Sequence, residues 1–217
     1  MFGSPGSGKG TQAKLLAKRI GIPHISTGDM LRERVRADRE WGAAVAPAMQ
    51  SGSLAPDRVV NRMVEERLGC PDAAGGFILD GYPRTLAQAG ELCRWLDGRG
   101  VSEVVIYLAV DYNSIIARLM GRRQCPRCGS LYNLVSQPPR VDMLCDRDGE
   151  KLVVRDDDSE AVIRERLDAY ERQTTPVLEF LRQAGRRVEE VAAGGDSPER
   201  VFERICGIIG VGNHDRA

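Results

Sequence analysis

A glycine-rich segment near the start of the chain, Gly3-Ser4-Pro5-Gly6-Ser7-Gly8-Lys9-Gly10-Thr11, constrains the fold more than any other feature. Its glycines allow a tight turn with several backbone N–H groups pointing inward, and a following helix adds the positive end of its dipole. Four apolar residues follow at helical spacing: Ala13, Leu16, Ala17 and Ile20. The pattern predicts a phosphate-binding loop, with Lys9 reaching the terminal phosphates of a nucleotide.

The residues around this loop depart from the general pattern in two ways. Ser or Thr usually follows the lysine directly, whereas here Gly10 intervenes and Thr11 comes one place later. Such a loop also follows a buried strand, and here only Met1 and Phe2 precede it, so we expect the first core strand to be largely missing from this chain. A flexible surface loop is the alternative in a chain with 24 glycines, but the helical pattern disfavours it.

Length and charge exclude several classes of protein. A chain of 217 residues is long enough for one α/β domain with small insertions. The 31 basic residues balance 31 acidic ones, which argues against a general nucleic-acid or membrane-surface binder. There is no run of eighteen apolar residues and no export signal at the start, and the six cysteines do not resemble a secreted disulfide framework. We therefore expect a cytoplasmic protein.

Short apolar runs alternate with helical stretches, which favours an α/β fold with a doubly wound parallel sheet flanked by helices. The expected strands are 23–26, 76–80, 103–110 and 187–192. Helices are expected over 29–39, 58–68 and 111–122, from Ser159 onward, from Pro176, and after an N-cap at Ser197. Between Arg122 and Asp158 the pattern changes to Cys, Pro, Gly and short β-like pieces, which predicts a separate small module.

A second group of polar residues follows the expected strands. Ser26-Thr27-Gly28-Asp29-Met30-Leu31-Arg32 comes after one strand and opens a helix, so its N–H groups, with Thr27 and Arg32, suit a second phosphate. Asp80 ends a buried strand, a position suited to ordering a hydrated Mg²⁺ beside the loop lysine. Directly after it stand Gly81-Tyr82-Pro83-Arg84 and then Gln88. Taken singly each has an ordinary explanation, but together they indicate a phosphate-acceptor site.

The Lys9-Gly10-Thr11-Gln12 loop, the segment Ser26 to Arg32 and the segment Asp80-Gly81-Tyr82-Pro83-Arg84-Thr85 together resemble the adenylate kinase family, the long bacterial type with a zinc-bearing lid. The resemblance covers nearly the whole chain and implies a P-loop core with two mobile insertions. It implies a core over 1–25, 56–120 and 159–217, a small helical insertion for the nucleoside monophosphate over 26–55, and a small β-rich lid with a zinc knot over 121–158.

The resemblance also assigns residues to two nucleotides. On the ATP side it implies Gly6, Ser7, Gly8, Lys9, Gly10, Thr11, Arg118, Arg122, Leu131, Tyr132 and Gly195, with Thr11 and Asp80 holding Mg²⁺ through water. On the AMP side it implies Thr27, Arg32, Ser53, Leu54, Ala55, Gly81, Tyr82, Pro83, Arg84, Gln88, Arg155 and Arg166. The amide edge of Gln88 suits adenine, which favours AMP over CMP or UMP.

The small module contains two pairs of possible metal ligands, Cys125 with Cys128 and Cys145 with Asp148, each pair separated by two residues. Three thiolates and a carboxylate can complete a tetrahedral shell around Zn²⁺, and the resemblance supports this set. A structural zinc would replace the core that so small a module lacks. A catalytic zinc is disfavoured because protein ligands fill all four positions, and buried thiols without metal are the remaining alternative.

Arginines flank the module. Arg118 and Arg122 lie four apart on one face of the expected helix that enters the module, and Arg155 and Arg166 flank its exit. Such residues are usually solvated surface charges. The resemblance instead implies a catalytic set of Lys9, Arg84, Arg118, Arg122, Arg155 and Arg166. Asp156, Asp157 and Asp158 precede a helix, where its dipole favours acids, and some are expected to pair with the arginines.

The sequence therefore predicts an enzyme that reversibly transfers the γ-phosphoryl group of MgATP to AMP, giving two ADP, and that acts as a monomer on small nucleotides without nucleic acid or membrane partners. Three alternatives stay open. They are a kinase for UMP or CMP, an inactive copy that lacks its first strand, and a zinc-module binding protein whose loop only senses nucleotide.

Overall fold

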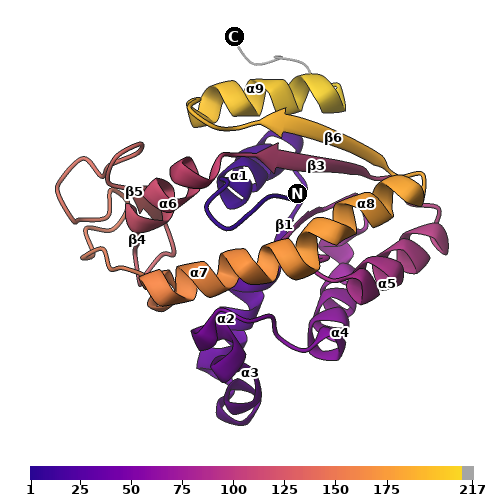
Figure 1. Cartoon of the computed structure of the whole chain (residues 1–217), viewed down its shortest axis with the longest axis horizontal. Helices are drawn as coiled ribbons and strands as arrows, with labels where there is room; N and C mark the ends of the chain where they lie inside the picture. The colour runs from indigo at the N-terminus through magenta and orange to yellow at the C-terminus, as the bar shows by residue number, and fades with distance from the viewer. Residues whose placement is uncertain (212–217) are drawn as a thin grey trace.

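The computed structural model describes residues 1–211. Its centre is a parallel sheet, with helices on both faces, so the predicted doubly wound α/β fold is confirmed (Figure 1). Strand β1 (His24–Ser26) pairs with β2 (Ile78–Asp80), and β3 (Val104–Ala109) pairs with β6 (Arg187–Ala192). Each lies within the expected range or matches it.

Met1 and Phe2 join the two strand pairs into one layer. Phe2 forms a parallel bridge with Tyr107, donating its N–H to Ile106 O at 2.7 Å and accepting from Leu108 N–H at 2.9 Å. On the other side the Met1 ammonium donates to Leu79 O at 2.8 Å. Phe2 therefore contributes one bridge between the two strand pairs and is buried in the middle of the sheet.

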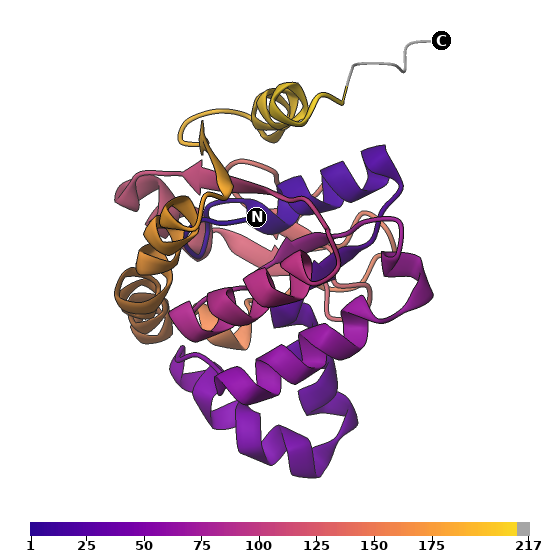
Figure 2. The same cartoon turned by 90° about the vertical axis from the view of Figure 1, so that its right-hand side faces the viewer.

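Alternating residues of β3 face two helical layers, as the period of a strand requires. Ile106 and Leu108 pack against α1 (Lys9–Ile20) and α9 (Pro198–Ile209). Val105 packs on the opposite face against α5 (Leu86–Asp97) and α8 (Thr175–Gln183). Figure 2 shows helices on both sides of the strands. Ser197 caps α9 as predicted, since its side chain accepts from Arg200 N–H.

The helix expected from Pro176 is present as α8, which begins one residue earlier, so that the proline stands in its first turn. Helix α7 (Glu160–Ala169) continues through a π-helical turn, η3 (Tyr170–Thr174), directly into α8. The three elements together form one long helical rod across the molecule (Figure 1). In that turn Thr175 N–H bonds to Tyr170 O, five residues back. The hydrogen-bond ladder is therefore already irregular before Pro176, which explains why a residue without an N–H is accommodated there.

Three helices form the insertion between β1 and β2: α2 (Thr27–Ala37), α3 (Arg39–Ser51) and α4 (Asp57–Leu68). Helices α2 and α3 lie below the sheet in both views (Figure 1, Figure 2). The expected helix 29–39 begins two residues earlier and stops at Ala37, because Asp38 caps α3 by accepting from Trp41 N–H at 2.9 Å. Helix α3 was not predicted individually. A short 3₁₀ turn, η1 (Pro71–Ala73), leads to β2.

Helix α6 (Tyr112–Met120) leads into the segment 121–158, hereafter the lid segment. Strands β4 (Arg122–Gln124) and β5 (Leu131–Asn133) pair antiparallel there, and a short turn, η2 (Asp156–Asp158), leads back to α7. The segment lies to one side of the sheet (Figure 1). No helix among residues 1–211 is long and apolar enough to cross a membrane.

Candidate active site

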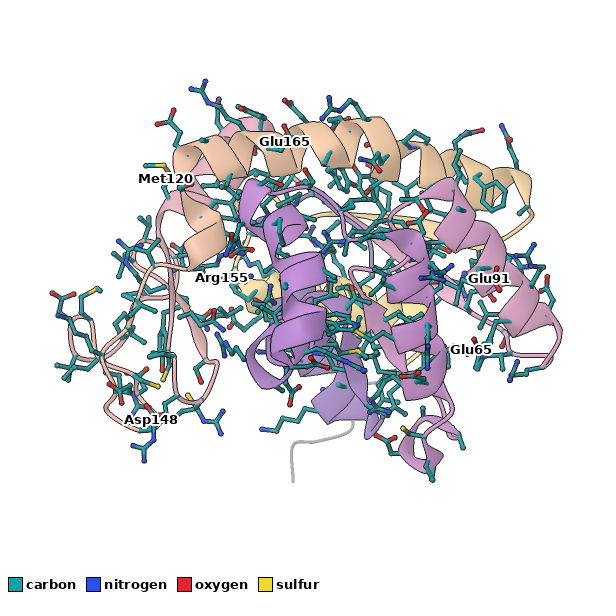
Figure 3. All side chains as sticks on the ribbon, turned by 90° about the horizontal axis from the view of Figure 1, so that it is seen from below. Glu65, Glu91, Met120, Asp148, Arg155 and Glu165 are labelled. Carbon is teal, nitrogen blue, oxygen red and sulfur yellow. The ribbon has the colours of Figure 1, made fainter. Side chains whose placement is uncertain are left out.

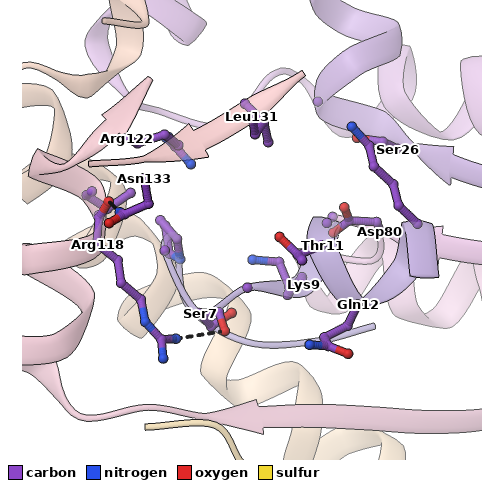
Figure 4. A pocket seen from close by; sticks show the side chains of 18 of the residues that line it. Ser7, Lys9, Thr11, Gln12, Ser26, Asp80, Arg118, Arg122, Leu131 and Asn133 are labelled. Atoms are coloured by element: carbon purple, nitrogen blue, oxygen red, sulfur yellow. Dashed lines mark hydrogen bonds between the residues drawn. The ribbon is translucent and has the colours of Figure 1, made fainter. Parts of the chain in front are cut away.

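A cavity of about 240 Å³ lies where the glycine-rich loop, the ends of β1 and β2, and the lid segment meet (Figure 4). Lys9, Thr11 and Asp80 lie on one side, and Arg122 and Leu131 lie across from them on the lid strands. The carboxyl ends of parallel strands are where open α/β sheets bind ligands. The cavity occupies that position.

The glycine-rich loop leads directly into α1, as the motif requires. Gly8 precedes the helix with a φ of 96°, a left-handed conformation that favours glycine. The Lys9 ammonium donates to Ser4 O at 3.0 Å, which holds the side chain across the loop. Burial disfavours its charge and lowers the pKa of Lys9 from 10.5 to about 8. A bound polyphosphate would restore the favoured charge.

The unusual Gly10 is explained by Asp80. A Cβ atom built on Gly10 would lie 3.2 Å from Asp80 Oδ2, a tight contact, so a serine or threonine would crowd that carboxylate. Thr11, one place later, lines the cavity instead. Burial alone would raise the pKa of Asp80, but the hydrogen bond from His24 at 3.2 Å and the charge of Lys9 outweigh it, and the pKa falls to about 2. Asp80 is therefore a fully ionised carboxylate at the cavity wall.

A cluster of arginines faces this carboxylate from the other elements. Arg118 donates to Ser7 O at 3.3 Å and to Ala193 O at 2.6 Å, which ties α6 to the loop. Burial, together with repulsion from neighbouring cations, lowers the pKa of Arg84 and of Arg155 to about 10 and lowers the pKa of Arg166. All three stay charged at neutral pH, so the lowered values report an excess of buried positive charge. The site is built to receive anions.

Two aspartates offset part of this charge. Asp158 accepts from Arg122 Nε at 2.7 Å and from Arg166 at 3.2 Å, and its side chain is fully buried. Asp157 accepts from Arg155 Nε at 2.9 Å and lies 3.0 Å from Arg166. The expectation that some of these acids pair with arginines is therefore confirmed in the structure. The pairs hold the guanidinium groups in place at the exit of the lid segment.

A second cavity of about 70 Å³ adjoins the first. Leu31, Met49 and Val60 supply apolar wall, and Gln88 lies among them. Gly81 stands at its edge with a φ of 79°, and a Cβ there would lie 2.9 Å from both Arg84 Nη2 and Thr27 Oγ1. Only glycine at position 81 lets the side chains of Arg84 and Thr27 approach the backbone there so closely. Thr27 in turn donates to Gly81 O at 2.8 Å.

Most of the expected site residues line these two cavities. Of the ATP-side set, the larger cavity is lined by Gly6, Ser7, Gly8, Lys9, Gly10, Thr11, Arg118, Arg122, Leu131 and Tyr132. Of the AMP-side set, the smaller cavity is lined by Thr27, Arg32, Ser53, Leu54, Ala55, Gly81, Arg84, Gln88 and Arg166. Residues far apart in the chain are therefore neighbours in space.

A few expected residues lie elsewhere. Gly195 lies between two residues that line the larger cavity, Ala193 and Asp196, and is not itself among the lining residues described. Arg155 lines the larger cavity rather than the smaller one, at the junction of the lid segment with α7 (Figure 3). Tyr82 and Pro83 line a third, small cavity beside the loop.

Two lining residues, His24 and Asn133, were not foreseen from the sequence. His24 bonds to Asp80, and Asn133 donates from Nδ2 to Arg118 O at 2.8 Å. His24 contacts Asp80 from the neighbouring strand β1, and Asn133 contacts Arg118 of α6 from β5, so no local motif marks either residue. His24 does lie within the expected strand that ends at Ser26, which was the one available signal.

The four candidate metal ligands converge in the lid segment. Sγ of Cys125, Cys128 and Cys145 and a carboxylate oxygen of Asp148 lie within 4.8 Å of one another. Cys128 Sγ lies 3.5 Å from Cys145 Sγ, and Cys125 Sγ lies 3.4 Å from Asp148 Oδ1. Two thiolates about 2.3 Å from a tetrahedral zinc ion are about 3.8 Å apart, and a thiolate and a carboxylate oxygen at about 2.0 Å are about 3.5 Å apart. The donor set and its spacing fit zinc.

The side chain of Tyr132 belongs to this cluster. Its hydroxyl lies 3.4 Å from Cys145 Sγ and accepts from Asp146 N–H at 2.8 Å. The side chain is therefore engaged with the cysteines, although Tyr132 also lines the larger cavity. Asp148 lies at the outer part of the segment, well away from Arg155 (Figure 3). The cluster thus lies at a distance from Arg155.

Fold and site together define a P-loop nucleotide phosphotransferase with two adjoining cavities. The sequence model of the adenylate kinase family matches residues 1–186. The chain is 43% identical over 211 residues to an adenylate kinase of Thermoanaerobacter sp. (strain X514), covering 97% of this chain and 96% of that protein. It is 48% identical over 181 residues to one of Pseudothermotoga lettingae, covering 83% of each chain. One of Methanocella arvoryzae is 46% identical over 184 residues, covering 84% of this chain and 85% of that protein. The chain belongs to the adenylate kinase family.

Proposed function

We propose that this chain reversibly transfers the γ-phosphoryl group of MgATP to AMP and gives two molecules of ADP. One observation carries the proposal: the two cavities share a boundary. Gly28, Arg32, Gly81, Arg84 and Arg166 line both. Three of the five are arginines, so two phosphate tails entering from opposite sides would meet in a positively charged passage.

The reaction needs alignment more than acid–base chemistry. The acceptor phosphate is already largely ionised near neutral pH, because its second pKa is about 6. Lys9 and Arg118 would hold the donor phosphates, whereas Arg84 and Arg166 would neutralise charge on the group in transfer. Mg²⁺ bound with ATP would screen the remaining charge, and we propose that Thr11 and Asp80 hold its water ligands.

Water must be kept from the transferred group, since it would otherwise hydrolyse ATP. We propose that the insertion 26–55 and the lid segment 121–158 close over a core formed by 1–25, 56–120 and 159–217. Closure would bring Arg122, Arg155 and Arg166 onto the phosphates only when both nucleotides are present. Residues 212–217 of the proposed core lie outside the described residues.

The acceptor can be tested directly. Purified protein with MgATP should transfer phosphate to AMP with a kcat/KM at least about 100-fold above those for CMP, UMP and GMP. The apolar walls and the amide of Gln88 support adenine as the base, and the UMP or CMP kinase stays the alternative. Preference for a pyrimidine nucleotide would favour that alternative. Tight ATP binding without any ADP formation would favour a nucleotide-sensing protein.

The lowered pKa of Lys9 gives a pH dependence. In the free protein the ammonium loses its charge as pH rises through about 8, so kcat/KM for ATP should fall about tenfold per pH unit above that value. Bound ATP raises the pKa of Lys9, so kcat at saturating ATP should stay level to a higher pH. Initial rates between pH 6 and 10 check both curves, and superimposed profiles would contradict the assignment.

Zinc in the lid segment is a second proposal, with Cys125, Cys128, Cys145 and Asp148 as ligands. Its role would be structural, since the four protein ligands leave no open position. Protein prepared with zinc should hold one ion per chain, and removal by a chelator should lower the melting temperature by at least about 5 °C. Cys145→Ser should abolish zinc binding, whereas Cys70→Ser, at an exposed position, should leave it intact. Zinc-free protein with an unchanged melting temperature would contradict the proposal.

We further propose that the chain acts as a monomer in the cytoplasm on nucleotides alone. Sedimentation at micromolar concentration with and without MgATP and AMP tests the first point. A stable dimer would contradict it.

A further inference from the structure

The amide of Gln88 is held at both ends. Gln88 lines the smaller cavity, yet only 2% of its surface is exposed. Its Oε1 accepts from Arg84 N–H at 2.7 Å, and its Nε2 donates to Asp57 Oδ1 at 2.7 Å. Both bonds are short, so this side chain is fixed before any base arrives.

Asp57 is fixed in turn. Its other oxygen, Oδ2, accepts from Thr85 Oγ1 at 2.9 Å, and Thr85 caps the helix that carries Gln88. Asp57 is the first residue of α4, where the helix dipole favours a carboxylate. Asp57 contacts Gln88 but is not among the residues that line the smaller cavity. It therefore reaches a bound base only through Gln88.

These partners determine which end of the amide is oxygen and which is nitrogen. A backbone N–H can only donate, so the end beside Arg84 must be the oxygen. A carboxylate only accepts, so the end beside Asp57 must be the NH₂ group. The flipped amide would place donor against donor and acceptor against acceptor. After both bonds are made, one N–H and one oxygen lone pair remain for a ligand.

We infer that Asp57 is a positioning residue that, together with the backbone N–H of Arg84, sets the polarity of the Gln88 amide and thereby selects the base. This inference rests on the proposed function, because it assumes that the smaller cavity takes the nucleoside monophosphate. The remaining N–H and lone pair complement a base edge with a ring nitrogen acceptor beside an exocyclic amino donor, as in 6-aminopurines. They oppose the ring N–H beside a carbonyl in 6-oxopurines. Cytosine shares the aminopurine pattern, so only the size of the cavity separates it from adenine.

Inosine monophosphate is the sharpest probe, since its base has the ring size of adenine but the reversed edge. The wild-type protein should prefer AMP over IMP in kcat/KM by at least about 1,000-fold. Asp57→Ala should reduce this ratio at least about tenfold, through a higher KM for AMP with little change in kcat. Asn61→Ala is the matched control, because it removes the partner of the Tyr82 hydroxyl from the same helix and leaves the amide contacts intact. The control should keep the wild-type ratio.

A charge-conserving exchange, Asp57→Asn with Gln88→Glu, guards against simple loss of folding. The amide introduced at position 57 can still accept from Thr85 and can donate to the carboxylate introduced at position 88, which still accepts from Arg84 N–H. The exchanged pair offers only lone pairs to the base, so the AMP-to-IMP ratio should fall toward one. A wild-type ratio in both the Asp57→Ala and the exchanged protein would overturn the inference. A wild-type protein that transfers no phosphate to AMP would instead contradict the proposed function itself.

Discussion

Replacing Lys9 by methionine should lower kcat/KM for ATP by at least about 1,000-fold. The ammonium lies against the loop, 3.0 Å from Ser4 O, and faces a cavity lined by the other predicted phosphate ligands. Its loss removes the charge that compensates the terminal phosphates during transfer. Steady-state rates with MgATP and AMP, and ATP binding by calorimetry, measure the effect on turnover and on affinity separately.

The same substitution should leave the fold intact. Burial already disfavours the Lys9 charge, as its lowered pKa shows, so an uncharged side chain of similar length should keep or slightly raise the melting temperature. Lys18→Met on the exposed face of the same helix is the control and should retain full activity. A Lys9→Met protein with near wild-type turnover would remove the loop from the mechanism.

Arg84→Ala should lower kcat by about 100- to 1,000-fold. Arg84 lies on the boundary shared by the two cavities, and its Nε donates to Gly81 O at 2.9 Å, which aims the guanidinium between them. Burial and repulsion from Arg166 lower its pKa to about 10, so the charge is costly without an anion and is retained for binding one. Single-turnover rates measure the loss in the transfer step.

Stability separates this role from a structural one. The substitution breaks one side-chain hydrogen bond to the backbone, which is worth about 1 kcal/mol. Arg94→Ala on α5 is the control, since its exposed guanidinium pairs only with Glu91 among the described contacts. It should leave turnover unchanged. Equal fractional losses of turnover and of stability in Arg84→Ala would count against a catalytic role.

The parallel core was predictable where its strands are short apolar runs that end in polar loops. β2 (Ile78–Asp80) shows this most clearly: its three buried residues pass directly into a glycine turn. Helix α3 was harder, because it carries Pro47 in its interior and, where its burial is described, only Gly42 and Val45 are buried. Its position depends on tertiary contact: a Cβ on Gly52, at its C-terminal end, would lie 2.9 Å from Val162 O of α7. No local pattern records that approach.

Site residues likewise divide into those that a local motif reveals and those that only the folded chain reveals. Lys9, Thr27 and Arg84 stand in short motifs whose chemistry can be read locally. Asp57 lies 31 positions from the Gln88 amide that it orients, and only the folded chain brings the two together. Residues that touch a ligand are therefore easier to find in a sequence than residues that position them.

The central claim is that the γ-phosphoryl group passes directly between two nucleotides bound in adjoining cavities. Incubation with ATP labelled at the γ-phosphorus, magnesium and unlabelled AMP tests it most directly. The label should appear in the β-position of newly formed ADP, with two ADP produced for each ATP consumed and almost no labelled inorganic phosphate. Label released as inorganic phosphate, or remaining in ATP after prolonged incubation, would contradict the account.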